Sequence, residues 1–263
     1  MSSFSGQRAL VFGGETGIGR AAAEVLAARG CSVLIAGILE DPGAETVASI
    51  RQAGGDISFV TTDVRIPRQV ETATEDAREK TGRIDIMIYA CGVYDGYAAC
   101  LDVGEDLWDQ VLEINLKGCF RACQSVLGTM VPQGYGRIVA VASVASYIGT
   151  ADGLPYTVSK SGMLGMVRHV GTSYASHGIT MNAVCPGVIT TDMRANSARV
   201  LGTVAPPMER GVGYDPDAYK NFVPAQRRGA PSEVGELMAF IASREAGYIT
   251  GQGFVIDGGW LAA

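Results

Sequence analysis

The chain has 263 residues, with 21 basic and 27 acidic side chains, a formal net charge of −6 and 47% apolar residues. This composition excludes intrinsic disorder, and the absence of a basic block predicts no nucleic-acid partner. No apolar run approaches the roughly 18 residues of a membrane span, and the first residues lack a secretory pattern, so no membrane partner is expected. Six cysteines without a CxxC pair are typical of reduced thiols, which predicts a cytoplasmic location.

Short apolar runs without two-residue alternation predict strands that are covered on both faces. Helical patterns separate these runs from one another, which is the order of elements in a parallel sheet with helices on either side. The expected strands are residues 9–12, 32–36, 57–61, 86–89, 138–142, 180–184 and 254–256.

The first expected helix begins near Ile18 and ends at Gly30, because Ile18, Ala22 and Leu26 recur at helical spacing. The other expected helices are residues 44–53, 70–80, 107–130, 155–176 and 234–242. Right-handed crossovers between the strands then favour a Rossmann-type doubly wound α/β fold. Since no linker or internal repeat interrupts the chain, we expect one domain over residues 1–263.

Residues 190–228 form the one long irregular stretch, rich in Pro, Gly and Met. Loops of this length in compact domains are usually functional lids or disordered segments. Because this stretch follows the carboxyl end of an expected strand, where such folds bind ligands, we expect a lid. A surface insertion is the alternative.

Residues 13–19 read Gly-Gly-Glu-Thr-Gly-Ile-Gly and lie between the first strand and the first helix. Glycines let the backbone turn sharply against a pyrophosphate, and the helix N-terminus supplies free N–H groups and a partial positive charge. This position predicts a dinucleotide site, although the spacing is not the usual G-x-G-x-x-G. A glycine-rich turn without a ligand is the alternative.

The end of the second strand normally decides between the two nicotinamide cofactors. An acidic residue there binds the adenosine ribose of NAD, and a nearby arginine accepts the 2′-phosphate of NADP. This chain has Gly37 and Ile38 at that point, with Glu40 and Asp41 beyond. Since neither this stretch nor Thr16 offers a positive charge, we expect NAD, with NADP not excluded.

Tyr156 and Lys160 are four residues apart on an expected helix and therefore share one face. A neighbouring ammonium would lower the tyrosine pKa from about 10 and suit it to acid–base catalysis. A surface Tyr–Lys pair is the alternative. Ser143 ends the fifth strand and is a candidate for bonding a substrate oxygen, or else a turn cap. Asn115 is a polar residue in an apolar helix, whose other role would be to bond nearby backbone.

Together these motifs resemble the short-chain dehydrogenase/reductase family over essentially the whole chain. The matching motifs are Gly13-x-x-x-Gly17-Ile18-Gly19, Asp63-Val64, Asn115, Ser143, Tyr156-x-x-x-Lys160, Pro186-Gly187-Val188-Ile189-x-Thr191, Thr250-Gly251-Gln252 and Asp257-Gly258-Gly259. The resemblance implies a homotetramer or homodimer that moves a hydride between NAD(P) and an alcohol/carbonyl pair.

The resemblance also implies roles for individual residues. Tyr156 is similar to the catalytic acid/base, Lys160 to the partner that lowers its pKa and holds the nicotinamide ribose, Ser143 to the residue that orients the substrate, and Asn115 to the support of a proton-relaying water. The implied cofactor-binding residues are Gly13, Thr16, Gly17, Ile18, Gly19, Ile38, Asp63, Val64, Gly92, Tyr156, Lys160, Pro186, Gly187, Val188 and Thr191. No metal site is expected, because His169 and His177 suit capping or surface positions.

Three positions depart from the family pattern. Phe12 stands where the family has threonine before the glycine loop. Tyr89-Ala90-Cys91-Gly92 replaces Asn-Asn-Ala-Gly and loses its amide side chains. Gly37 replaces the acid that selects the ribose. These departures concern cofactor affinity and identity rather than the chemistry.

We therefore interpret the chain as an NAD(P)-dependent alcohol dehydrogenase or ketone reductase acting on a secondary alcohol/ketone pair. Tyr94, Tyr97, Tyr147 and the lid favour an apolar or cyclic substrate. One alternative is a 3-oxoacyl-carrier-protein reductase, which would want basic residues near the mouth of the site. Another is a catalytically silent dinucleotide-binding regulator.

Overall fold

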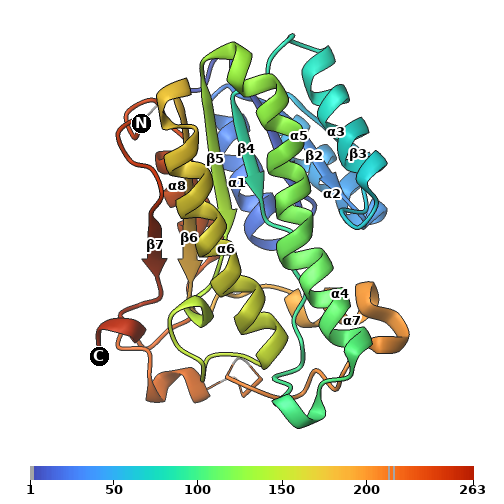
Figure 1. The fold of residues 1–263 in the computed structure, drawn as a ribbon, viewed down its shortest axis with the longest axis vertical. Helices are drawn as coiled ribbons and strands as arrows, with labels where there is room; N and C mark the ends of the chain where they lie inside the picture. The colour runs from blue at the N-terminus through green and yellow to red at the C-terminus, as the bar shows by residue number, and fades with distance from the viewer. Residues whose placement is uncertain (1–2, 213, 216) are drawn as a thin grey trace.

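The computed structural model describes residues 3–212, 214–215 and 217–263 and contains one seven-stranded sheet (Figure 1). The strands run parallel in the order β3-β2-β1-β4-β5-β6-β7. Their bounds are β1 Arg8–Phe12, β2 Ser32–Gly37, β3 Ile57–Thr61, β4 Ile86–Tyr89, β5 Gly136–Val141, β6 Ile179–Pro186 and β7 Gly253–Ile256. This order confirms the Rossmann-type fold, and it reverses direction between β1 and β4, where such sheets bind ligands.

Helices cover both faces of the sheet. They are α1 Gly17–Ala28, α2 Glu40–Gln52, α3 Pro67–Glu79, α4 Glu105–Leu112, α5 Gly118–Gln133, α6 Leu154–Ser173, α7 Met193–Leu201 and α8 Pro231–Ile241. Short 3₁₀ turns lie at Cys100–Asp102, Val144–Ser146, Ala175–His177, Gly202–Val204, Ala218–Asn221 and Trp260–Ala262. Among the described residues, no helix combines the length and apolarity needed to cross a bilayer.

Alternate side chains of each strand enter two separate cores. In β1, Leu10 and Phe12 pack with α3, α4, α5 and α6, whereas Ala9 and Val11 pack with α1, α2 and α8. Both sets are fully buried, which is why the strand sequence shows no polar alternation.

The predicted helices are present, with one internal difference. Residues 107–130 were expected as one regular helix, but α4 and α5 are joined by a π-helical segment, Glu113–Lys117. Apolar periodicity cannot reveal such an insertion because α4 and α5 continue on either side of it. π-segments are frequent at functional sites, and this one contains Asn115.

The stretch 190–228 is less irregular than predicted, because it contains α7. Residues 213 and 216 of this stretch lie outside the described residues. Pro and Gly are concentrated after Leu201, so the composition of the whole stretch hides the helical composition of its first part. Ser197 and Leu201 are the buried residues of α7.

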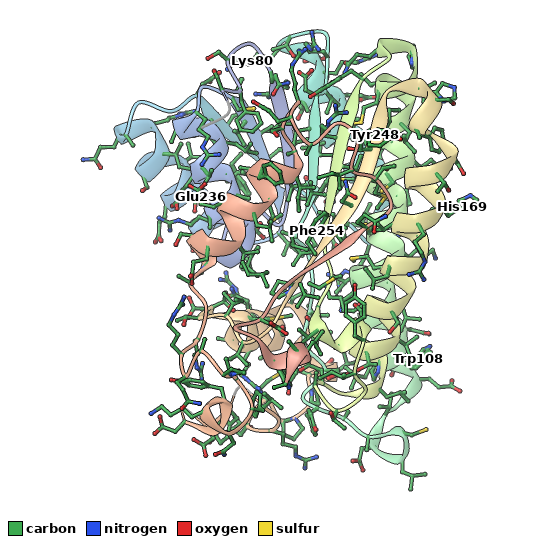
Figure 2. All side chains as sticks on the ribbon, turned by 90° about the vertical axis from the view of Figure 1, so that its left-hand side faces the viewer. Lys80, Trp108, His169, Glu236, Tyr248 and Phe254 are labelled. Carbon is green, nitrogen blue, oxygen red and sulfur yellow. The ribbon has the colours of Figure 1, made fainter. Side chains whose placement is uncertain are left out.

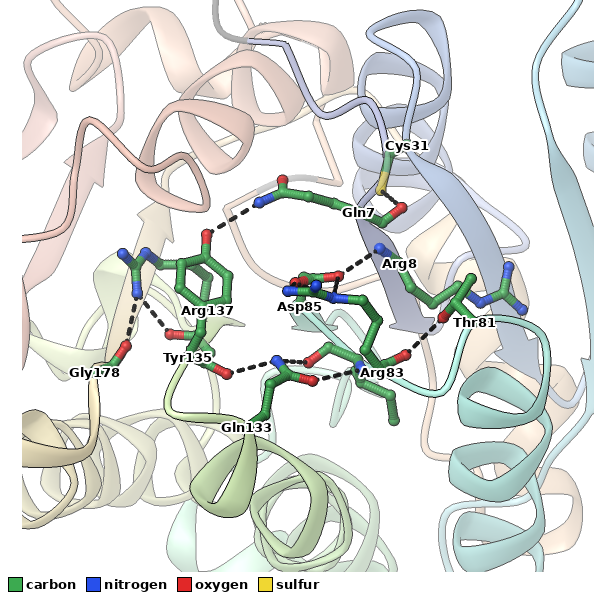
Figure 3. A network of polar contacts seen from close by, with 12 residues as sticks. Gln7, Arg8, Cys31, Thr81, Arg83, Asp85, Gln133, Tyr135, Arg137 and Gly178 are labelled. Atoms are coloured by element: carbon green, nitrogen blue, oxygen red, sulfur yellow. Dashed lines mark hydrogen bonds and ion pairs between the residues drawn. The ribbon is translucent and has the colours of Figure 1, made fainter.

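Figure 3 shows a polar network at the amino-terminal ends of the central strands, opposite the ligand-binding edge. Asp85 is fully buried beside β4 and accepts the backbone N–H of Arg8 at 2.8 Å. It also accepts Nε of Arg83 at 2.9 Å. Its own backbone carbonyl accepts the N–H of Arg137. One carboxylate therefore ties the starts of β1 and β4 together, and its backbone continues the connection to β5.

We predict that Asp85→Ala lowers the free energy of unfolding by about 1–3 kcal/mol, because a buried backbone N–H loses its partner. Urea denaturation measures this change. Lys80→Ala, which removes an exposed pair with Asp56, should cost less than about 1 kcal/mol. Equal losses in the two variants would contradict the assigned role of Asp85.

Candidate active site

A cavity of about 320 Å³ lies along the carboxyl ends of the strands. Every cofactor-binding residue implied by the sequence lines it, from Gly13 in the glycine loop to Thr191 after β6. Ser143, Tyr156 and Lys160 also line it. Asn115 does not belong to its wall and is fully buried behind it.

The glycine loop depends on two positions where a side chain has no space. Gly13 has φ 75°, and a Cβ there would lie 2.6 Å from the backbone N of Cys91. A Cβ on Gly19 would lie 2.0 Å from the carbonyl oxygen of Gly13. α1 begins at Gly17, and its N-cap Thr16 makes no side-chain cap bond. The N–H groups of the first turn are therefore left for an anion, which fits a pyrophosphate.

The segment after β6 covers this loop. Nδ2 of Asn196 in α7 donates to Oγ1 of Thr16 at 3.4 Å. Cγ2 of Thr191 would lie 3.3 Å from a Cβ on Gly17. Met193, Arg194, Asn196 and Val200 line the cavity. Residues of the 190–228 stretch therefore form part of the cavity wall, as a lid would.

A carboxylate lies at the end of β2, although it does not belong to a residue of β2. An ideal Cβ on Gly37 would lie 2.0 Å from Oε2 of Glu15, so the Glu15 side chain occupies the place that a β2 side chain would fill. Glu15 is buried and lines the cavity with Ile38. The sequence has Gly37 where the acid that selects the ribose is expected, and the structure brings the carboxylate of Glu15 from the glycine loop to that place.

Asp63, the acid after β3, is already paired. It forms a 2.7 Å ion pair with Arg65 and accepts the Arg65 backbone N–H at 2.9 Å. The Arg65 guanidinium also donates to Oε1 of Gln110 at 2.8 Å. Burial opposes ionisation of Asp63, but the bonds from Arg65 outweigh it and lower its pKa.

Tyr156 and Ser143 meet at the cavity wall from α6 and from the end of β5. The Ser143 hydroxyl accepts the N–H of Ala145 at 3.1 Å, and Ser143 favours the ionised form of the neighbouring Tyr156 phenol. The turn-cap alternative for Ser143 is thus present together with the contact to Tyr156. Nζ of Lys160 lies 5.4 Å from the Tyr156 ring centre and donates to the carbonyl of Val141 at 2.7 Å.

Burial opposes the low pKa that the spacing of Tyr156 and Lys160 predicts for the phenol. Burial raises the pKa of Tyr156 well above its ordinary value, Asp152 adds to the rise, and Ser143 opposes it. Burial also lowers the pKa of Lys160 to about 8. For both groups, the free energy lost by removing the charged form from water is the largest effect on the pKa. The spacing of i and i+4 is therefore not enough to give a low phenol pKa.

Asn115 acts on the backbone rather than on the cavity. Its Oδ1 accepts the N–H of Val93 at 2.8 Å, and its Nδ2 donates to the Val93 carbonyl and to Oγ of Ser159, both at 3.1 Å. These bonds join the π-helical segment to the chain after β4 and to α6. The alternative in which Asn115 bonds nearby backbone is therefore present.

Two carboxyls near Tyr156 carried no signal in the sequence. Asp95 is fully buried, and its Oδ2 accepts the backbone N–H of Tyr156 at 2.9 Å in the first turn of α6. Asp152 lines the cavity. Burial and the nearby Asp95 raise the pKa of Asp152 to about 8, although Arg194 opposes the rise. Asp152 lies four residues before Tyr156 in the sequence, whereas only the tertiary structure brings Asp95 beside Tyr156.

The aromatic expectations are only partly right. Tyr94 lines the cavity, and its ring centre lies 6.3 Å from that of Tyr156. Arg194 lies 4.3 Å above the Tyr94 ring. Tyr97 and Tyr147 do not line the cavity. The substrate end therefore combines apolar side chains with the carboxyl of Asp152 and the guanidinium of Arg194.

The motif Tyr89-Ala90-Cys91-Gly92, which begins at the last residue of β4, makes contacts of its own. The Tyr89 hydroxyl donates to the carbonyl of Ile114 in the π-helical segment. A Cβ on Gly118 would lie 2.3 Å from that hydroxyl. Phe12 is fully buried and stacks at 6.2 Å from Tyr89. The Phe12–Tyr89 contact thus links β1 to β4, and the Tyr89 hydroxyl links β4 to the π-helical segment. These contacts lie in the region where the family pattern has amide side chains.

The remaining candidate residues form no second site within the described part of the chain. His169 lies exposed on the outer side of α6 (Figure 2), and His177 is also exposed. No group of His, Cys, Asp and Glu in the described residues has the arrangement of a metal site. All six cysteines are free thiols.

Comparisons with known proteins agree with this geometry. A family model described as enoyl-(acyl carrier protein) reductase matches residues 13–261. The short-chain reductase protein NovJ of Streptomyces niveus is 36% identical over 251 residues, which are 95% of this chain and 92% of that protein. The 3-oxoacyl-(acyl-carrier-protein) reductase FabG of Salmonella typhimurium is 34% identical over 258 residues, 98% of each chain.

Solved structures show the same fold. Levodione reductase has a TM-score of 0.90 at 29% identity, with 99% of both chains covered. A variant of actinorhodin polyketide ketoreductase, solved with NADPH, has a TM-score of 0.87 at 32% identity, again with 99% of both chains covered. The chain therefore belongs to the short-chain dehydrogenase/reductase family of NAD(P)-dependent oxidoreductases.

Proposed function

We propose that the protein interconverts a ketone and a secondary alcohol with NAD, and that Tyr156 exchanges the proton. The observation that carries this proposal is that Ser143, Tyr156 and Lys160 line the same cavity as the glycine loop. A glycine loop alone would also suit a silent binding protein. The added Ser–Tyr pair, with Lys160 behind it, favours catalysis.

The residues present fit a bound dinucleotide. The N–H groups at the start of α1, which the side chain of the N-cap Thr16 does not bond, suit its pyrophosphate. Val188 and Thr191 line the same cavity after β6. When bound, NAD(P) accepts a hydride from an alcohol carbon or supplies one to a carbonyl carbon.

The chain's own groups would handle the proton and the substrate oxygen. In reduction, the Tyr156 hydroxyl gives its proton to the oxygen of the carbonyl as the carbon receives hydride. In oxidation, the phenolate takes that proton back. Ser143 orients the oxygen, and the Lys160 ammonium stabilises the phenolate. Asn115 serves as a positioning residue, through its bonds to Val93 and Ser159.

The cavity supports a ketone that carries a polar group near the carbonyl. Val144, Met193 and Trp260 offer apolar surface, while the Asp152 carboxyl and the Arg194 guanidinium offer polar groups. Arg228 also lines the cavity, so the basic residues that an acyl-carrier-protein substrate would want are present after all. Reduction of a 3-oxoacyl thioester therefore remains the second candidate, supported by the 34% identity to the FabG reductase.

We further propose that residues 1–263 act as one cytoplasmic domain that assembles as a homotetramer or homodimer. Phe120 on α5 and Val255 on β7 are apolar side chains with exposed fractions of 50% and 43%, and self-association would remove them from water. Sedimentation equilibrium measures this assembly, and a monomer at micromolar concentration would contradict it.

We predict that Tyr156→Phe retains the fold and NADH binding but loses at least about 100-fold in turnover, because only the exchangeable proton is removed. The assay follows NADH or NADPH oxidation with a panel of ketones that includes a 3-oxoacyl thioester. Tyr248→Phe, at a fully exposed position (Figure 2), should leave turnover unchanged. Near-normal activity of Tyr156→Phe would refute the mechanism, and an inactive wild type would favour the silent regulator.

We predict that Asp152→Asn moves the pH profile of alcohol oxidation to lower pH by about one unit. Oxidation needs the phenolate, and Asp152, Asp95 and Tyr94 all raise the pKa of Tyr156. Because the pKa of Asp152 is about 8, its charge is present above that pH, where the two profiles should separate. The measurement is kcat/KM for the alcohol across pH.

The control for this experiment is Asp102→Asn, an exposed carboxyl outside the cavity. Its pH profile should match that of the wild type. A profile of Asp152→Asn that stays in place, or moves to higher pH, would contradict the electrostatic role of Asp152.

A further inference from the structure

The glycine loop lies unusually close to β2. A Cβ on Gly14 would lie 2.5 Å from Cγ2 of Ile35, and one on Gly37 would lie 2.0 Å from Oε2 of Glu15. Gly14 thus lets the loop approach Ile35 of β2, and Gly37 leaves space for the Glu15 carboxylate. The carboxylate therefore lies where the last side chain of β2 would point.

The position of Glu15 is fixed by its backbone. Its backbone carbonyl accepts Oγ1 of the fully buried Thr46 at 3.0 Å. Burial raises the pKa of its carboxyl, and the backbone of Glu15, Leu39 and Ile38 opposes that rise. Even so, Oε2 is buried and has no hydrogen-bond partner among the described residues. A buried carboxylate oxygen without a donor is costly unless a ligand supplies one.

The other acids near this end of the cavity are less suited to bind a ligand. Asp63 is held by Arg65. Glu40 accepts the hydroxyl of Thr61 at 3.0 Å, and neither Glu40 nor Asp41 lines the cavity. Glu15 therefore lines the cavity beside the end of β2, and its Oε2 still lacks a hydrogen-bond donor.

In dinucleotide-binding folds, a carboxylate at this place accepts hydrogen bonds from the adenosine ribose hydroxyls. We propose that Glu15, from the glycine loop, performs this task in place of a β2 side chain and selects NAD over NADP. This inference rests on the proposed binding of a dinucleotide. A 2′-phosphate would bring two further negative charges against a carboxylate in a site of low polarity, and the nearby Arg65 is already engaged by Asp63.

Glu15→Gln tests the proposal, with affinities for NADH and NADPH measured by isothermal titration calorimetry rather than by turnover. Loss of the charged acceptor should weaken NADH binding about tenfold or more. NADPH binding should be unchanged or tighter, so the ratio of the two dissociation constants falls by at least that factor. Glu40→Gln is the matched control and should leave the ratio unchanged.

A second pair of variants separates ribose binding from a purely structural role. Gly37→Asp alone should weaken binding of both cofactors, because its side chain collides with Glu15. The double variant Glu15→Ser/Gly37→Asp moves the carboxylate to β2 and should restore the preference for NADH. Such a rescue is not expected if Glu15 only holds the loop against β2.

Measurements on the wild type keep the proposal testable if a variant fails to fold. Adenosine 5′-monophosphate should bind about tenfold tighter than its 2′-deoxy analogue, because the deoxy compound lacks the donor. Equal affinities would overturn the proposal, as would equal changes for NADH and NADPH in Glu15→Gln or a Glu40→Gln variant that alone alters the ratio. A wild type that binds neither cofactor would instead overturn the proposed function itself.

Discussion

The contact between Gly19 and the carbonyl of Gly13 is the constraint on which the site depends. Because there is no room for a Cβ between them, α1 can begin at Gly17, after a short loop that follows β1, and direct its first N–H groups into the cavity. The same closeness brings Gly13 against the backbone of Cys91 after β4. Three elements therefore meet at the point where the strand order reverses, and the cavity follows from their meeting.

The wall of the cavity formed by α6 contains several buried ionisable groups. α6 brings Tyr156 and Lys160 to the wall, and Asp95 holds the first turn of that helix through the Tyr156 N–H. Burial raises the phenol pKa and lowers that of the ammonium, which are the directions that disfavour charge. The phenol is therefore neutral at neutral pH, whereas Lys160, with a pKa of about 8, is still mostly protonated. The phenolate requires further positive charge in the site. The positively charged form of the nicotinamide ring supplies that charge when the dinucleotide is bound.

The polar groups at the two ends of the sheet differ in whether their hydrogen bonds are made within the protein. At the amino-terminal ends, Asp85 connects β1, β4 and β5 by bonds that are complete within the protein. At the carboxyl ends, Oε2 of Glu15 and the first N–H groups of α1 are left without such partners. A closed network gives stability, whereas open donors and acceptors are what a ligand can complete.

The sequence by itself determined the layers of the fold, because uninterrupted apolar runs such as residues 9–12 leave no choice but burial on both faces. It also identified most of the cavity wall, since the glycine loop and the Tyr156–Lys160 pair are defined by short local spacings. The π-helical segment is not predicted because it does not change the apolar periodicity. α7 is not predicted because the later residues of the 190–228 stretch, rich in Pro and Gly, dominate its composition. Only the tertiary structure showed that Glu15 fills the space left by Gly37, and that Asp95 lies beside Tyr156. These side chains come from separate loops, and their pKa values and partners depend on contacts between distant segments that no local pattern records.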